Sequence, residues 1–225
     1  MIVNRLRRNL GRLYWTFRDQ VCRRTWSFFV WKRPSEPPQL TQGRIILAGK
    51  GDERIGERMA ALRGAPVDRY SSWLAAGHWA LYAVGPDNEI QSWIWFTVAN
   101  AGSQIAPFDF EIDMKVPPGV GFLWDAFTVP AYRRQGLYKA LLVRSIDECF
   151  AHGAKLVWGH AQITNRSREV IRTTDHAGET TIQAMRIGPF FRISGPGFHR
   201  TLSVRGVLEM DPLLSVGVNA DNAAS

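Results

Sequence analysis

The chain has 225 residues, of which 45% are hydrophobic and 21% charged. This length suits one well-buried domain with an appendage and leaves too little chain for two large domains. The net charge of +8 is concentrated in residues 1–33, which carry nine basic residues and one acid, so the rest of the chain is formally neutral and is no general polyanion binder.

The first predicted element is a basic amphipathic helix at the N-terminus. Its apolar residues recur at spacings of four and three, which places them in one helical stripe with most arginines outside it. The stripe consists of Ile2, Leu6, Leu10, Leu13, Phe17 and Val21.

Aromatic residues enrich this region, at Trp15 and in the run Trp26-Ser27-Phe28-Phe29-Val30-Trp31. Basic helices with Trp and Phe bind anionic membrane surfaces, and the alternative is packing on the body of the protein or on a second subunit. Prolines 34, 37 and 38 then indicate a linker. We therefore expect an arm and linker over residues 1–40, a folded domain over 41–210 and a mobile tail over 211–225.

Element types alternate through the body of the chain, with a hairpin turn at residues 85–88. Strands are expected at 44–48, 78–84, 89–98, 108–116, 122–129, 155–160, 180–193 and 198–204. Helices are expected at 52–62, 67–76, from the turn at 133–138 to about His152, and at 165–174. This order predicts an α+β fold with a mixed, mostly antiparallel central sheet flanked by helices.

The most informative segment runs from Val129 to Leu142, where a strand passes through a glycine-containing turn into a helix. Amide groups at a helix start have no intrahelical acceptor, and the helix dipole adds positive potential, so a pyrophosphate is stabilised there. Gly136 allows close approach of a phosphate. Arg133, Arg134 and Lys139 add charge, and arginine binds phosphate oxygens through its planar fork.

The turn Arg133-Arg134-Gln135-Gly136-Leu137-Tyr138 resembles the Gln/Arg-x-x-Gly-x-Gly/Ala motif of the GNAT acyltransferase superfamily. The preceding Val129-Pro130-Ala131-Tyr132 is a familiar lead-in for that family, and the element order over about residues 43–206 matches its architecture. Tyr138 departs from the pattern, because Gly or Ala is usual there.

The resemblance implies acetyl-CoA or another acyl-CoA as co-substrate. Its pyrophosphate would contact Arg133, Arg134, Gln135, Gly136, Leu137, Tyr138 and Lys139, and its pantetheine arm would pair with Phe127, Thr128 and Val129. The strand ending in these residues and the strand 155–160 would splay apart to admit the arm. A backbone amide near Thr128 is the expected oxyanion donor.

Acyl transfer to an amine also needs a route for the amine proton. Asp125 is the first candidate base, because strand alternation would place it on a face with Leu123, Phe127 and Val129. Its alternative role is a bond to neighbouring backbone or to a helix end. Glu111, with Asp113 on the same strand face, is an alternative base or part of an amine-binding carboxylate pair; the other interpretation of both residues is an exposed polar strand face.

His160 ends the strand after the phosphate-turn helix, near the expected splay point, and is a candidate proton carrier or a structural histidine. Asn165-Arg166-Ser167 resembles the Asn-x-x-Ser/Ala helix start of the family with one residue fewer in the spacing. Asn165 is therefore a candidate cofactor contact or a helix N-cap. The usual tyrosine acid has no counterpart after it.

The two cysteines cannot form a disulfide framework, and with scattered histidines they offer no metal-ligand spacing. No apolar run approaches the roughly 20 residues of a membrane span. We expect a cytoplasmic, metal-free N-acetyltransferase that acts on a primary amine of a small molecule or sugar by direct attack, with peripheral membrane binding as one role of the arm. The alternatives are a protein N-acetyltransferase and a non-catalytic acyl-CoA-binding module; nucleic-acid binding is a third alternative, for the arm alone.

Overall fold

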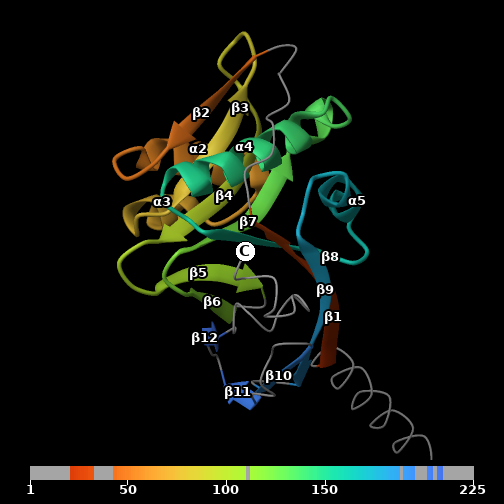
Figure 1. Ribbon diagram of the computed structural model, residues 1–225. Helices are drawn as coiled ribbons and strands as arrows, with labels where there is room; N and C mark the ends of the chain where they lie inside the picture. The colour runs from red at the N-terminus through yellow and green to blue at the C-terminus, as the bar shows by residue number, and fades with distance from the viewer. Residues whose placement is uncertain are drawn as a thin grey trace, which may run out of the picture.

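The computed structural model describes residues 21–32, 43–109, 112–187, 190–195, 202–204 and 207–209. Within these residues, nine strands form one sheet in the order β11-β10-β9-β1-β8-β7-β4-β3-β2 (Figure 1). Its strands are β1 (Val21–Trp31), β2 (Arg44–Ala48), β3 (Trp79–Val84), β4 (Ile90–Ala99), β7 (Val120–Thr128), β8 (Leu156–Gln162), β9 (Gly178–Ile187), β10 (Phe190–Ser194) and β11 (Leu202–Val204).

A smaller sheet has the order β12-β6-β5. Its strands are β5 (Gln104–Asp109), β6 (Ile112–Val116) and β12 (Val207–Glu209). The helices are α2 (Glu53–Arg63), α3 (Asp68–Ala75), α4 (Leu137–Ala151) and α5 (Ser167–Arg172), with a 3₁₀ turn η1 at Pro130–Tyr132. No helix in the described part of the chain is long and apolar enough to cross a bilayer.

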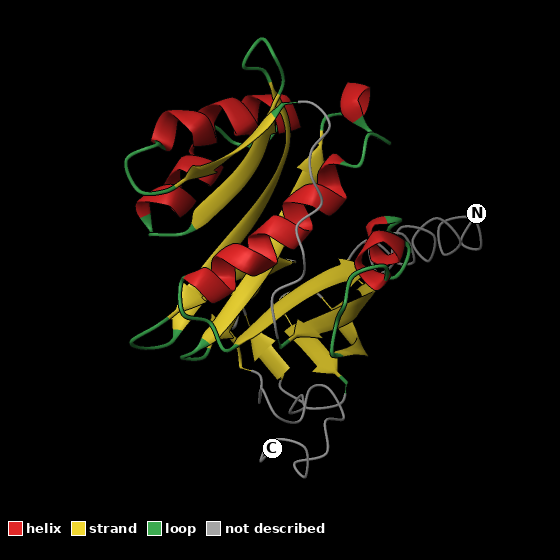
Figure 2. Ribbon diagram, turned by 45° about the horizontal axis from the view of Figure 1, so that its top comes forward, coloured by secondary structure: helices red, strands yellow, loops and turns green. Residues whose placement is uncertain are grey.

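The main sheet separates two hydrophobic layers. On one face Trp93, Trp95 and Phe122 pack with Tyr70 and Leu74 of α3 and with residues of the small sheet. Alternate residues of the same strands point to the opposite face, because successive side chains of a strand alternate. There they meet the buried side of α4, which crosses the sheet in Figure 2.

Strand β1 corrects the expectation for the N-terminal region. Residues 21–31 do not continue a helix: they form a strand between β8 and β9, with Phe28 opposite His160 on one side and Thr180 on the other. Trp26, Phe28, Phe29 and Trp31 are almost fully buried. The aromatic run is therefore part of the central core, and the expected domain boundary at residue 40 is wrong for this segment. The expected helix over residues 2–20 lies outside the described residues, as does the tail from residue 211.

Most other expected elements are confirmed within one or two residues, including the antiparallel β3–β4 hairpin. Two expected strands are wrong in the same way. The segment 108–116 belongs to β5 and β6, which pair with each other, and the segment 180–193 belongs to β9 and β10, which also form an antiparallel pair. Both reversals were missed because the alternation of apolar and polar residues continues from one strand of each pair into the next.

Candidate functional site

The C-terminal half of β7 is irregular at Asp125. The β4–β7 register shifts between the pairs Trp93–Phe127 and Trp95–Trp124, which leaves an extra residue on β7. Asp125 adopts a positive φ of 40°, in the left-handed region that aspartate tolerates better than most residues. The bulge redirects the carboxylate toward α2 and α3, where Arg63 lies 3.6 Å from it.

The expected shared face of Asp125 and Leu123 is therefore wrong. Leu123 packs in the layer under α4, whereas Asp125 lies on the opposite side of the sheet with Phe127, which packs against the layer below α2 and α3. Strict alternation fails because a bulge inserts one residue and reverses the side on which the next residues point. Asp125 is thus placed at a local distortion, next to the strand segment Phe127-Thr128.

Strands β7 and β8 run parallel and pair only from Val120–Leu156 to Leu123–Gly159. Beyond these four pairs, the β2–β7 half and the β8–β11 half run in different directions in Figure 1. Val129 donates its amide to Gln91 of β4, so alternation turns the Thr128 amide the other way, toward the side of β8. Phe127, Thr128 and Val129, which are half-buried, lie beyond the last β7–β8 pair and so border this splay.

The turn after β7 gives α4 an open N-terminus. Arg134 and Gly136 both have positive φ, of 67° and 78°, and Gly136 is the N-cap residue without a side-chain cap. The first intrahelical bond runs from the Ala140 amide to Gly136, so the amides of Leu137, Tyr138 and Lys139 remain available. Arg133, Arg134, Gln135 and Lys139 are exposed around them. The residues present therefore fit a pyrophosphate.

Arg133 is oriented within this turn. Its Nε donates to the Thr128 carbonyl at 3.1 Å, and its guanidinium carbon lies 6.0 Å from the Phe127 ring centre. This bond uses one edge of the guanidinium and leaves its terminal nitrogens free of that contact. Arg133 thereby links the strand that borders the splay to the turn that begins α4.

Tyr138 does not obstruct the turn. Its side chain packs against the layer under α4, where burial raises the pKa of the phenol and a hydrogen bond with Ser167 opposes that shift. The phenol therefore points toward the start of α5, and a residue larger than Gly or Ala is accommodated at this position of the motif.

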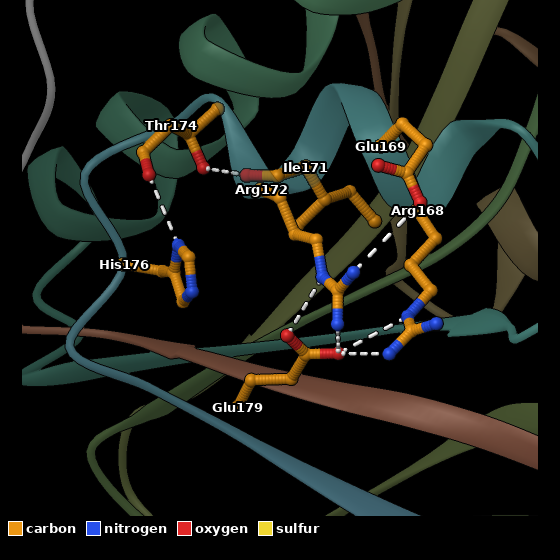
Figure 3. Close-up of polar contacts among 7 residues, drawn as sticks. All are labelled: Arg168, Glu169, Ile171, Arg172, Thr174, His176 and Glu179. Carbon is orange, nitrogen blue, oxygen red and sulfur yellow. Dashed lines mark hydrogen bonds and ion pairs between the residues drawn. The ribbon is translucent and has the colours of Figure 1, made fainter.

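Helix α5 is short, so it relies on tertiary contacts. Figure 3 shows Glu179 of β9 between two arginines of α5. Arg168 donates to Oε1 at 2.9 Å, and Arg172 donates to Oε2 at 2.9 Å. Burial alone would raise the pKa of Glu179, but hydrogen bonds from Arg172, Ser27 and Arg168 outweigh it and lower the pKa to about 2.

Asn165 lies one residue before Arg166, the N-cap residue of this helix, and its Oδ1 accepts the Ser167 amide at 3.0 Å. This bond leaves the side-chain NH₂ group for other partners. His160 follows Gly159, the last β8 residue that pairs with β7, so it lies at the splay point as expected. Its ring stacks on Phe122 at 5.6 Å and lies 4.4 Å from that of Phe108, in an aromatic setting. Glu111 lies outside the described residues.

The comparisons with known proteins agree with this geometry. The model of the acetyltransferase (GNAT) family matches residues 59–171, half of the chain. The chain belongs to the GNAT acetyltransferase family. The match runs from within α2 into α5 and includes Asp125, the turn and Asn165.

Solved structures resemble this chain at low sequence identity. A Drosophila protein aligns with a TM-score of 0.52 and 15% identity over 74% of this chain and 52% of its own. A GCN5-related N-acetyltransferase from Sphaerobacter thermophilus aligns with a TM-score of 0.45 and 15% identity over 83% of this chain and 56% of its own. The chain thus spans about half the length of these two structures. No curated protein matches it.

Two residues of this GNAT chain were not identified from the sequence. Arg63, the last residue of α2, and Tyr70 of α3 both face Asp125, although they precede it by more than 50 positions. Tyr70 is fully buried, and burial together with the negative charge of Asp125 raises its pKa. No local pattern marks either residue, since only the packing of α2 and α3 on the sheet brings them to β7.

In the described ranges, no group of three or more His, Cys, Asp or Glu side chains is arranged to hold a metal ion. Cys149 lies on the buried face of α4, and burial raises the pKa of its thiol, which disfavours the thiolate.

Proposed function

We propose that this GNAT protein is an acyl-CoA-dependent N-acetyltransferase that acts on a primary amine of a small molecule or sugar by direct attack. The observation that carries the proposal is the continuity of one segment: the bulge at Asp125, the splayed main chain of Phe127-Thr128-Val129 and the open N-terminus of α4 follow one another within 15 residues. A donor with a long polar arm and a pyrophosphate matches this order.

Acetyl-CoA supplies the acyl group as a thioester. We assign the open amides of α4 with Arg133, Arg134, Gln135 and Lys139 to its pyrophosphate, and the free side-chain amide of Asn165 to a contact from α5. The Thr128 amide is suited to hold the carbonyl oxygen as it gains negative charge. The acceptor nitrogen then forms a bond to the carbonyl carbon while the carbon–sulfur bond breaks.

Asp125 is proposed as the group that accepts the proton released by the amine, since it lies two residues before Phe127 on the splayed strand. His160 at the splay point and Glu111 remain alternatives for proton transfer. Asp125→Asn is the matched test: the amide has the same size, and asparagine also tolerates a positive φ. We expect turnover to fall by about 100-fold or more, with acetyl-CoA binding retained.

The cofactor and the reaction are tested separately on the full chain. Acetyl-CoA should raise the melting temperature, since a ligand that binds only the folded state stabilises it. A panel of alkylamines, amino sugars and lysine peptides is then assayed by detection of free CoA thiol. Absence of a thermal shift at millimolar acetyl-CoA would remove the cofactor assignment. Binding without thiol release across the panel would favour a non-catalytic acyl-CoA-binding module, and release only with peptides would favour a protein acetyltransferase.

Membrane association is a separate proposal, and it rests on residues 1–20 alone, because residues 21–31 are part of the sheet. Liposome co-sedimentation of the full chain and of a chain without residues 1–20 tests it. Equal sedimentation of both on anionic vesicles would contradict a membrane role for these residues.

A further inference from the structure

Arg63 covers the Asp125 carboxylate and the Phe127 ring, which belong to the strand that borders the splay. Its terminal nitrogen is 3.6 Å from Oδ1 of Asp125, and its guanidinium carbon is 4.4 Å from the centre of the Phe127 ring. A carboxylate beside an aromatic face is the combination that proteins use to bind organic cations. In this structure an arginine of the chain itself occupies that position.

The carboxylate beneath Arg63 also faces Tyr70 of α3. The Tyr70 side chain is fully buried, and after burial itself the negative charge of Asp125 and a hydrogen bond with Asp125 raise the pKa of the phenol. The Asp125 carboxylate therefore lies between the Arg63 guanidinium and a buried hydroxyl group.

Aromatic rings pack behind Phe127. The Trp93 ring centre is 4.8 Å from that of Phe127, and the Tyr70 ring centre is 6.0 Å from that of Trp93. Tyr70 and Trp93 are buried, so the aromatic surface next to the charged nitrogen is the Phe127 ring, which favours an alkyl or aryl group on that nitrogen. We call the four residues Asp125, Phe127, Tyr70 and Trp93 the cation site.

Arg63 is held weakly. Its side chain is 35% exposed, and the 3.6 Å separation from Asp125 is that of an ion pair without a hydrogen bond. Pairs that are this open to solvent stabilise a protein little. Its position as the last residue of α2, before the left-handed cap Gly64, lets the side chain swing outward without unfolding a helical turn.

We propose that the acceptor enters as a small alkyl- or arylalkyl-ammonium ion that displaces Arg63 from the cation site, so that Arg63 sets the affinity for the acceptor. This inference rests on the proposed function and adds the acceptor class and a residue that selects it. Arg63 competes with the incoming cation for Asp125 and Phe127. Its removal therefore exposes the site and also removes a like charge.

Tetramethylammonium is the probe, because it carries the cation and cannot be acetylated. Binding to the full-length protein is followed by tryptophan fluorescence at constant ionic strength, with tert-butanol as the neutral probe of similar shape. We expect Arg63→Ala to bind tetramethylammonium about fivefold more tightly than the wild type, as expected for loss of a weak competing ion pair. Arg63→Gln should act in the same direction, and neither variant should gain affinity for tert-butanol.

Two further variants make the test specific. Asp125→Asn should lose tetramethylammonium binding by about tenfold or more, because the cation loses its counter-charge. Arg58→Ala is the matched control: Arg58 lies on the same helix as Arg63 and donates to the Asn88 carbonyl at 3.1 Å, so the variant removes the same charge without uncovering Asp125. It should bind the probe like the wild type.

Equal affinity of the wild type, Arg63→Ala and Arg63→Gln for tetramethylammonium would overturn the inference, as would full binding by Asp125→Asn. If Arg58→Ala increased the affinity by the same factor, the effect would be one of net charge alone, and the inference would be overturned too. The acetyl-CoA thermal shift separates the two proposals. If acetyl-CoA raises the melting temperature while tetramethylammonium fails to bind, only the cation site is wrong. If acetyl-CoA causes no thermal shift, the proposed function fails.

Discussion

Replacing Trp31 by alanine tests the placement of β1 inside the sheet. Trp31 is 0% exposed, its ring lies over Gly159 of β8, and its indole N–H donates to Oγ1 of Thr174 at 3.0 Å. Burial of a tryptophan removes roughly 150–250 Å² from water, which at about 25 cal/mol per Å² amounts to about 4–6 kcal/mol. Measured losses for such truncations are about 3–5 kcal/mol, so we expect a loss of about 4 kcal/mol.

The assay is urea denaturation followed by far-UV circular dichroism, with the free energy of unfolding obtained by linear extrapolation. Trp31→Phe keeps a ring but removes the indole N–H, and should lose about 1–2 kcal/mol. Leu62→Ala is the control, since Leu62 is 45% exposed and its loss should stay within about 0.5 kcal/mol.

Deletion of residues 1–33 removes the whole of β1 and should abolish cooperative unfolding, whereas deletion of residues 1–20 should preserve it. The placement of β1 would be refuted if Trp31→Ala were no more destabilising than Leu62→Ala, and if the chain without residues 1–33 unfolded cooperatively at the wild-type midpoint.

Three further predictions concern pH and backbone conformation. Burial lowers the pKa of His78 from 6.5 to about 4. As the pH falls, the unfolded chain therefore binds this proton before the folded chain does, and the free energy of unfolding should decrease by about 3 kcal/mol between these two pH values. His78→Gln should flatten that part of a profile of urea midpoint against pH, and an unchanged slope would contradict the prediction. Because its pKa is lowered, Glu179 stabilises the fold above about pH 4.5, and this contribution is lost between pH 4.5 and 2. Glu179→Gln should unfold at a lower urea concentration at pH 7 and should no longer lose stability between pH 4.5 and 2. A wild-type urea midpoint in this variant would show that α5 does not depend on Glu179. Gly136 has free space for a methyl group but a φ of 78°, so Gly136→Ala should lower the free energy of unfolding by about 1–2 kcal/mol. Gly102 also has free space and has no positive φ, so Gly102→Ala should not lower it. Equal losses in the two variants would refute the argument from backbone conformation.

The parts of the fold that local patterns encode were predictable. The helix start at Gly136, the buried stripe of α4 and the β3–β4 hairpin follow from a glycine turn, a 3.6-residue period and a Pro-Asp-Asn turn, each of which acts within a few residues. The resemblance of the Arg133–Tyr138 turn to the GNAT motif added the family, which the match over residues 59–171 confirms.

The first strand shows where local patterns end. Trp26 to Trp31 is an apolar run with basic residues before it, and such a run fits an amphipathic arm as well as a buried strand. The choice is made by β8 and β9, which lie more than 120 residues further along the chain and provide both hydrogen-bonded edges. Pairing over such separations leaves no periodic signal in the sequence.

By itself, the sequence of this protein determined its helices and hairpins, the phosphate-type turn and Asp125 as a carboxylate beside it, because propensity, periodicity and turn chemistry are short-range properties. Only the tertiary structure decided on which side of β7 Asp125 lies, that Tyr138 points away from the turn, and that Arg63 covers Asp125 and Phe127. These outcomes depend on a bulge and on helices packed across a sheet, and both arise from contacts between segments that are distant in the chain.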